Sequence, residues 1–420
     1  MQKKLNQTTG RPANHILRFV LLVLIFTANL KGEGFRNPPP GTFDLGRAGG
    51  RIAQVDDSSA VQQNPANLVG VTNIQAQFTP TIVYINADFH STSGQSASTT
   101  DPWKLLPNFF ASVPLMQDKI AFGLGVTVPY GLGNEWNRNS SAFAQPTGVL
   151  TYTAPYYSKL VTLNLNPTIS IKLGDKIQVG VGLDVMWSDL QFKQLLSPLA
   201  PNLEADAEGT GFGFGGNLGV TWNITDHQRL AVTYRSPITV NYSGKAVFNN
   251  SGGVPSTSFG SQINFPSIVS VGYGIQITDA IRLESDVEWV EFSRFKNLPV
   301  NVGANLLSVP SQNIAENWHD TFTAGFGGDW QFATNWVARA GYQFYQSPVP
   351  DSTFSPTIPD ADQNVITVGF GWKGKHSSVE AAYGLDFYNT RNITTDQTAA
   401  FDGKYTFNVH LFSLAYNYSF

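Results

Sequence analysis

From about residue 74 to its C-terminus the chain repeats one pattern, in which apolar and polar residues alternate over a run and a turn follows. The run from Ile281 to Trp289 is typical, because its odd positions are mostly apolar. Its even positions are the charged residues Arg282, Glu284, Asp286 and Glu288. Successive side chains of a β-strand point to opposite faces. Each run therefore predicts a strand with one apolar and one polar face.

Fourteen such runs follow one another, joined alternately by short links and longer polar segments. In a sandwich the apolar faces would pack on a second sheet, whereas in an outer-membrane barrel they face lipid. An even strand number with short turns and long loops is typical of the barrel. We therefore predict an all-β fold, a transmembrane β-barrel of about 14 antiparallel strands. The predicted strands cover residues 74–89, 103–116, 118–131, 156–173, 175–193, 209–224, 227–249, 262–278, 279–296, 317–333, 335–346, 362–373, 376–389 and 402–420.

The last run ends in an aromatic residue at the C-terminus. Its bulky residues are Phe412, Leu414, Tyr416, Tyr418 and Phe420, and they alternate with small or polar ones. This ending resembles the signal that the outer-membrane assembly machinery reads. We therefore expect the chain to lie in the bacterial outer membrane, with lipid and the barrel assembly machinery as partners.

The charge content agrees with a membrane barrel and excludes other classes. Only 13% of residues are charged, about half of what soluble domains carry, yet the mean hydropathy of -0.12 is not that of a helical membrane protein. Lys and Arg are scattered and form no basic stripe, so no nucleic-acid partner is expected. The chain has no Cys, which excludes disulfides and thiolate chemistry.

The N-terminus has the features of a secretory signal peptide. Four basic residues, Lys3, Lys4, Arg11 and Arg18, precede the apolar run Phe19–Phe26. About ten apolar residues are too few to span a bilayer as a helix, which needs around 20. We predict a signal peptide over residues 1–33, with an uncleaved N-terminal anchor as the alternative.

No enzymatic chemistry is predicted. The stretches Gly211–Gly216 and Gly369–Gly374 match a dinucleotide fingerprint, but each lies in a strand run, and the fingerprint must lead from a strand into a helix. The six His residues lack ligand spacing, and no G-x-S-x-G motif occurs. We expect no catalytic residues, no metal site and no cofactor.

Residues 34–72 lie between the signal peptide and the barrel of residues 73–420. They are too rich in Pro and Gly for strands that face lipid and too apolar for a simple tail. Fourteen strands enclose more space than their own side chains fill, since eight strands are already just filled. We therefore predict that residues 34–72 form a hatch, a plug inside the lumen.

The register of the strands places several charged residues in the lumen. Burying an unpaired charge is costly, so we expect these residues to pair with each other or with Arg47 and Arg51 of the hatch. The predicted inward charges are Arg282, Glu284, Asp286, Glu288, Arg339 and Glu380.

Several short motifs occur in a fixed order along the mature chain. They are Gly34-Phe35, Leu45-Gly46-Arg47-Ala48, Asn64-Pro65-Ala66, Gly123-Leu124-Gly125-Val126, Pro129-Tyr130-Gly131, Tyr234-Arg235-Ser236-Pro237, Trp289 with Phe292-Ser293-Arg294-Phe295, Gln346-Ser347-Pro348-Val349-Pro350-Asp351 and Pro359-Asp360-Ala361-Asp362. With this order the chain resembles the FadL/TodX-type outer-membrane transporters of long-chain fatty acids and other hydrophobic compounds, over essentially the whole mature chain.

The resemblance implies a monomeric barrel that binds a hydrophobic small molecule at external loops and in an interior pocket. A rearrangement of the hatch then releases the ligand, which leaves sideways into the membrane through a kink in the third strand. The implied residues are Asn64, Pro65 and Ala66 in the hatch, Gly123, Gly125 and Pro129 at the lateral opening, and Phe35, Arg235, Arg294 and Arg339 around the ligand, with Lys296 as a further candidate.

Two of these assignments keep alternatives. The glycines Gly123 and Gly125 suit a bend in a strand, and close packing of the strand against the hatch is the alternative. The cargo is open between fatty acids and neutral hydrocarbons. A general diffusion porin is the second functional hypothesis, and an outer-membrane lipid hydrolase is the third.

Overall fold

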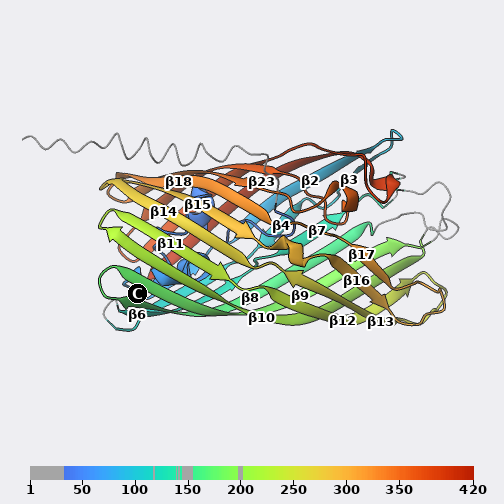
Figure 1. Cartoon of the computed structure of the whole chain (residues 1–420), viewed down its shortest axis with the longest axis horizontal. Coiled ribbons are helices and arrows are strands. Elements are labelled where there is room, and N and C mark those ends of the chain that lie inside the picture. The colour runs from blue at the N-terminus through green and yellow to red at the C-terminus, as the bar shows by residue number, and fades with distance from the viewer. Residues whose placement is uncertain (1–32, 117–118, 139, 141, 144–154, 197–201) are drawn as a thin grey trace, which may run out of the picture.

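The computed structural model describes residues 33–116, 119–138, 140, 142–143, 155–196 and 202–420. In this part of the chain antiparallel strands close into one barrel of fourteen strands, as predicted (Figure 1). The predicted signal peptide, residues 1–33, lies outside the described residues except for Glu33. No helix in the described ranges is long and apolar enough to cross a membrane.

Six of the fourteen barrel strands are single elements: β8 (Tyr157–Leu173), β9 (Ile177–Leu195), β10 (Glu204–Thr225), β19 (Trp336–Tyr345), β20 (Gln363–Lys373) and β23 (Gly403–Ser419). The other eight are interrupted: β1 (Gln75–Phe78) with β2 (Thr81–Ser91); β3 (Ser96–Ser98) with β4 (Trp103–Leu106) and β5 (Phe109–Pro114); β6 (Ile120–Thr127) with β7 (Gly131–Glu135); β11 (Gln228–Arg235) with β12 (Ile238–Asn249); β13 (Thr257–Phe265) with β14 (Ile268–Thr278); β15 (Ile281–Val290) with β16 (Asn297–Val302); β17 (Gln312–Ala315) with β18 (Thr321–Ala333); and β21 (Ser377–Tyr388) with β22 (Arg391–Ile393). A proline has no N–H to donate to a ladder, and six of the breaks contain one, namely Pro80, Pro102, Pro107, Pro129, Pro237 and Pro266.

The barrel closes where the first strand meets the last. β1 pairs with β23 from Gln75 opposite Ser419, and β2 pairs with the same strand as far as Ser91 opposite Gly403. The outward residues of the strands are apolar and exposed, for example Phe214 and Leu414. A slip of one residue would turn every side chain to the other face, so this arrangement confirms the predicted register.

Several strands extend beyond their predicted bounds, among them β10, which begins at Glu204 and not at 209, and β13, which begins at Thr257 and not at 262. The ninth and tenth barrel strands continue beyond the predicted ends at residues 296 and 317 through the hairpin of β16 and β17. The 3-10 turn η2 (Phe292–Arg294) lies just before it, and both Phe292 and Phe295 are buried. Alternation stops at this turn, which is why the sequence pattern did not show the extension.

The segment from residue 33 to 72, called the N-terminal segment below, lies inside the barrel (Figure 1). It forms the short helix α2 (Thr42–Arg47), the turn α3 (Ala60–Gln63) and the 3-10 helix η1 (Pro65–Gly70). α2 contacts β18, β19, β20, β21 and β23, whereas η1 contacts β6, β8, β9 and β10. The segment therefore touches opposite sides of the barrel wall.

Glycines on the inner face let the backbone of this segment approach the wall. A Cβ atom on Gly327 of β18 would lie 1.9 Å from the carbonyl oxygen of Arg47. A Cβ atom on Gly180 of β9 would lie 2.3 Å from the carbonyl carbon of Pro65. Only glycine permits such approaches, so the wall is shaped for this segment.

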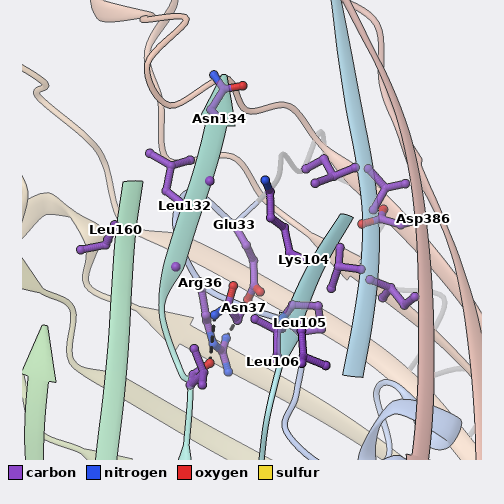
Figure 2. A pocket seen from close by; sticks show the side chains of 18 of the residues that line it. Glu33, Arg36, Asn37, Lys104, Leu105, Leu106, Leu132, Asn134, Leu160 and Asp386 are labelled. Carbon is purple, nitrogen blue, oxygen red and sulfur yellow. Dashed lines mark hydrogen bonds and ion pairs between the residues drawn. The ribbon is translucent and has the colours of Figure 1, made fainter. Parts of the chain in front are cut away.

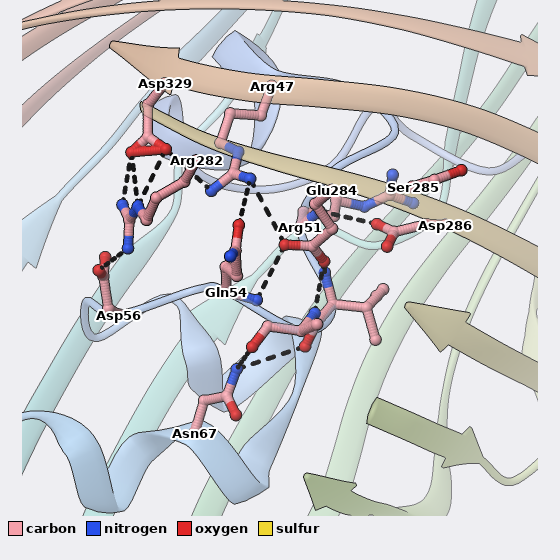
Figure 3. Close-up of polar contacts among 12 residues, drawn as sticks. Arg47, Arg51, Gln54, Asp56, Asn67, Arg282, Glu284, Ser285, Asp286 and Asp329 are labelled. Atoms are coloured by element: carbon pink, nitrogen blue, oxygen red, sulfur yellow. Dashed lines mark hydrogen bonds and ion pairs between the residues drawn. The ribbon is translucent and has the colours of Figure 1, made fainter. Parts of the chain in front are cut away.

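A group of charged residues joins the segment to β15 (Figure 3). The Glu284 carboxylate accepts hydrogen bonds from the backbone N–H groups of Ile52 at 2.7 Å, of Ala53, and of Gln54 at 2.9 Å. Arg47 pairs with Glu284 at 3.5 Å, and Arg51 pairs with Glu288.

Asp286 and the remaining inward charges are also engaged. The backbone N–H of Arg51 donates to Asp286 at 2.7 Å. Arg282 pairs with Asp56 and Asp329, and Arg339 with Glu380 at 2.8 Å. The predicted pairing of lumen charges with each other and with the hatch arginines is confirmed.

Candidate ligand cavity and wall opening

The third barrel strand is broken between β6 and β7. Thr127 is opposite Asn164 and Gly131 is opposite Val161, so three residues of the third strand face only two residues of β8. An extra residue of this kind bends a strand and interrupts its ladder. Pro129, which lies in the break, cannot donate a ladder hydrogen bond.

The backbone groups at this break bond to the N-terminal segment and to side chains. The N–H of Asn37 donates to the carbonyl of Pro129 at 3.0 Å, and its side-chain amide donates to the carbonyl of Val128 at 2.9 Å. The N–H of Gly131 donates to the carbonyl of Phe35 at 2.9 Å. The N-terminal segment therefore occupies the place that a neighbouring strand would take.

The barrel wall is open beside this break. β4 pairs with β2 on one side, and β7 pairs with β8 on its far side. Within the described residues, no ladder joins β4 to β7. The side chain of Lys104 projects across this space towards Gly133, where an added Cβ would lie 2.9 Å from its Cε atom.

A cavity of about 570 Å³ extends from the lumen into this opening (Figure 2). Its inner part is lined by apolar side chains that point into the barrel, among them Leu45, Val83, Val365, Val409 and Leu411. Its lining also includes Trp103, Leu105, Val161 and Leu163, which are exposed on the outer face. The volume falls within the 300–1,000 Å³ that is usual for small-molecule sites. The cavity thus reaches from the lumen to the outer face.

The bases that line this cavity all have carboxylate partners among the described residues. Arg36 pairs with Glu33 and with Glu288, each at 2.7 Å. Lys104 pairs with Asp101 at 2.6 Å. Lys159 pairs with Asp189 at 2.8 Å and Glu208 at 3.0 Å.

The cavity lining contains more acidic than basic side chains. Burial raises the pKa of the Glu33 carboxyl to about 8, even though the adjacent Arg36 guanidinium lowers it. The lining holds the carboxyls of Glu33, Asp101, Glu135 and Asp386 against three bases. The described lining of the cavity therefore offers no unpaired cation to an anionic ligand.

Pro129 lies at the break of the third strand, but Gly123 and Gly125 do not lie at the opening. Both glycines sit in unbroken ladders with β5 and β8. A Cβ on Gly123 would lie 2.5 Å from Leu68 and from Val61 of the N-terminal segment, and one on Gly125 would lie 3.0 Å from Val61. Close packing against the segment is the role that their surroundings support.

The Asn64-Pro65-Ala66 motif begins η1 and lies against the wall. The side-chain amide of Asn64 donates to the carbonyl of Ile52 and to Thr221, both at 2.8 Å, and its oxygen accepts from the N–H of Ala66 at 3.1 Å. Asn64 thus satisfies backbone groups of the N-terminal segment. The neighbours of the motif are β8, β9 and β10, and the contact with the third strand is made further along η1 by Leu68.

Phe35 is buried away from the cavity lining. Its ring contacts five other aromatic rings at centroid distances of 5.0 to 5.9 Å: Tyr130, Phe265, Phe292, Phe295 and Trp318. It fixes the start of the N-terminal segment beside the break in the third strand.

The basic residues suggested as ligand contacts also lie outside the cavity lining. Arg235 pairs with Asp184 and donates to the carbonyl of Gln62 at 3.0 Å, and Arg339 pairs with Glu380. Arg294 and Lys296 are exposed near η2. The two inward arginines are therefore engaged in ion pairs.

The cavity instead uses residues that sequence reasoning missed, namely Glu33, Arg36, Asn37, Lys104 and Asp386 (Figure 2). Asn37 precedes three prolines, which was a signal of a fixed and extended backbone. Asp386 was recognisable as an inward acid, but nothing local shows that its neighbours are apolar.

Comparison with known proteins gives consistent results. A family model described as outer membrane protein transport protein (OMPP1/FadL/TodX) matches residues 27–420. The long-chain fatty acid transport protein of Salmonella typhi is 24% identical, and the match covers 95% of this chain and 97% of that protein.

Two solved structures show the same fold. A FadL homologue of Pseudomonas aeruginosa has a TM-score of 0.80 at 22% identity, covering 92% of this chain and 100% of that one. The toluene transporter TbuX of Ralstonia pickettii has a TM-score of 0.73 at 20% identity, covering 91% of this chain and 99% of that one.

Proposed function

Because this chain belongs to the OMPP1/FadL/TodX family of outer membrane transport proteins, we propose that it takes up long-chain fatty acids or similar hydrophobic compounds through the cavity and the wall opening between β4 and β7. The family consists of transporters and not of enzymes, which removes the lipid hydrolase hypothesis. Its relatives include proteins named for long-chain fatty acids and for toluene.

The observation that carries the proposal is one cavity lined by both inner and outer side chains of the wall. Each CH₂ group of a hydrophobic cargo is worth about 0.8 kcal/mol when it is removed from water. A route through a watery pore would expose these groups again, whereas a route through the wall passes them from side chains to lipid. Backbone at membrane depth is tolerated without a partner strand only where protein or a cavity covers it, and Asn37 and Phe35 cover the break here.

We propose further that residues 34–72 act as a hatch. Arg36 and Asn37 line the cavity and Asn37 bonds to the third strand, so a shift of these two residues would widen the passage. The neighbouring Phe35 cluster and the charged contacts to β15 limit how far the rest of the segment follows. The hatch motion is then local to the residues beside the opening.

A reversible lock across the opening tests the route. The chain contains no cysteine, so Lys104→Cys with Gly133→Cys introduces the only two thiols. Bridging them with a short bifunctional thiol reagent that a reductant cleaves should stop uptake of labelled decanoate and toluene by cells that express the variant. Cleavage should restore uptake, and binding by the purified protein should persist throughout.

The matched control is a bridge where the wall is already continuous. Ala111 of β5 lies opposite Leu124 of β6, so Ala111→Cys with Leu124→Cys should leave uptake unchanged. Undiminished uptake with a verified bridge at residues 104 and 133 would refute the lateral route and favour the porin hypothesis.

The porin hypothesis is otherwise disfavoured by the N-terminal segment, which is buried inside the barrel and touches opposite walls. We propose that the barrel acts as a monomer. We also propose that lipid and the barrel assembly machinery are its partners in the membrane, since its last strand ends in the aromatic alternation described above.

A further inference from the structure

One carboxyl group interrupts the apolar inner wall of the cavity. Asp386 points from β21 towards the lumen and lines the cavity (Figure 2). The residue opposite it on β20 is Val365, and the residue opposite it on β23 is Val409. Both valines are buried and line the same cavity. For packing alone, a third valine would suit this position better than an acidic residue does.

One oxygen of Asp386 also lacks a partner in the part of the chain that the structure describes. Only 7% of the residue is exposed, and its Oδ1 atom is buried without a hydrogen-bond partner there. The charged groups that act on it are Asp360 and Glu33, which are themselves acidic. Buried polar groups are almost always hydrogen-bonded, so an exception calls for an explanation. A polar group of a ligand would supply the partner, because the carboxyl borders the cavity.

The chemistry around Asp386 selects among polar head groups. A carboxylate accepts a hydrogen bond from an O–H group, and a protonated carboxyl donates one to its oxygen. A hydroxyl is therefore complementary in either state. A fatty-acid carboxylate would instead meet Asp386 and Glu33 in the cavity lining, with Asp360 as a further acid acting on Asp386, and each cavity base already has a carboxylate partner. An ammonium group would have to leave water for a site walled by valines, which is expensive for a charged group.

We propose that Asp386 is the polar subsite of this cavity and that it binds the hydroxyl of an uncharged, otherwise apolar cargo such as a medium- or long-chain alcohol. The inference rests on the proposed function, because it assigns a ligand class to the same cavity. It narrows the cargo to molecules that combine an apolar body with one neutral hydroxyl. Hydrocarbons without a polar group bind by the apolar walls alone, and carboxylates bind least well.

Binding of four probes with the same alkyl chain tests the proposal: decane, 1-decanol, decanoate and decylamine. The detergent-solubilised full barrel is titrated with each labelled probe, and partition into empty micelles is subtracted. 1-Decanol should bind most tightly to the wild-type protein. Asp386→Leu should weaken 1-decanol binding about tenfold, since one hydrogen bond is lost, and should leave decane binding unchanged.

Two further variants distinguish the effect of the Asp386 carboxyl on binding from the effect of the shape of the cavity. Asp386→Asn keeps a carbonyl acceptor and should retain most of the preference for 1-decanol. Val409→Ala enlarges the same wall and should shift the binding of all four probes in parallel. If Asp386→Leu does not fold, the Asn variant and the order of the four probes still decide the question.

Three outcomes would overturn the assignment. Equal binding of decane and 1-decanol by the wild-type protein would show that Asp386 does not bind the hydroxyl. The proposed transport of hydrophobic compounds would still stand. Tighter binding of decylamine or decanoate than of 1-decanol would replace the hydroxyl with that head group. Failure of every probe to bind would remove the proposed function together with this inference.

Discussion

Replacing Glu284 by glutamine should free the middle of the N-terminal segment while leaving the barrel intact. The carboxylate accepts from three consecutive backbone N–H groups, those of Ile52, Ala53 and Gln54, and Arg47 lies 3.5 Å from its Oε2 atom. A glutamine side chain keeps one accepting oxygen and presents an NH₂ group in place of the other. That NH₂ group would face the N–H of Gln54 and the Arg47 guanidinium, which are both donors.

The size of the effect follows from the contacts that are lost. A hydrogen bond to a charged group contributes about 1.5–3 kcal/mol, and leaving a buried charge uncompensated adds to the cost. Loss of the Gln54 and Arg47 interactions therefore weakens the docking of the segment by roughly 3–4 kcal/mol. Since 1.4 kcal/mol is a factor of ten, local opening becomes about 10²–10³ times more frequent.

Hydrogen exchange measures this opening residue by residue. The amides of Ile52, Ala53 and Gln54 should exchange about 10²–10³ times faster in Glu284→Gln, while the ladder amides of β15 keep wild-type rates. Glu204→Gln is the control, because Glu204 is also a buried carboxyl but bonds to Tyr156 and Asn249 of the wall. This control should leave the exchange rates of residues 52–54 unchanged. Wild-type exchange at residues 52–54 in Glu284→Gln would refute the reasoning that this carboxylate holds the segment.

Two further changes test other contacts of the segment, and a third tests Glu316, which accepts a hydrogen bond from the indole of Trp318 beside Phe35. Gly180→Val should displace η1, because even a Cβ there would lie 2.3 Å from the η1 backbone, and planar-bilayer conductance should therefore rise. The control is Gly70→Ala, which should not change conductance because the space around its Cβ position is open. Phe35→Ala should cost about 3–5 kcal/mol of docking free energy and speed amide exchange in the third strand; unchanged exchange would contradict its role. Glu316 lies in the turn between β17 and β18. Burial raises the pKa of its carboxyl from 4.5 to about 8, so the packed turn keeps a proton that the opened turn loses, and the packed form should weaken as pH rises from 4.5 to 8. Glu316→Gln should remove this pH dependence in exchange measurements, and a dependence that survives would point to another group.

The number of strands and the face that each residue takes were predictable, because alternation is a local property of the sequence. The set Glu284, Asp286 and Glu288 illustrates this, since three acids at every second position belong on one face whatever the partner strands are. A plug inside the lumen also followed from strand number and composition. These inferences needed no knowledge of which residues meet across the barrel.

The opening and the cavity depend on contacts between distant parts of the chain, which no local pattern encodes. Arg235 and Arg339 were reasonable candidates for binding an anion until the pairs with Asp184 and Glu380 were visible. The two glycines of β6 suited a bend until Val61 and Leu68 were seen against them. The isolation of Asp386 arises from valines 21 residues before it and 23 residues after it. Such facts follow only from strand pairing in three dimensions.

The gap between β4 and β7 also bears on how this barrel meets other copies of itself. A strand with unpaired backbone groups is an exposed edge, and exposed edges recruit strands from other chains. Here the chain blunts its own edge in two ways: residues 35–37 bond along the third strand, and the ammonium-bearing Lys104 projects across the gap. A lysine at an edge discourages edge-to-edge pairing. A passage wide enough for a small molecule is thus kept from becoming an aggregation site between neighbouring barrels.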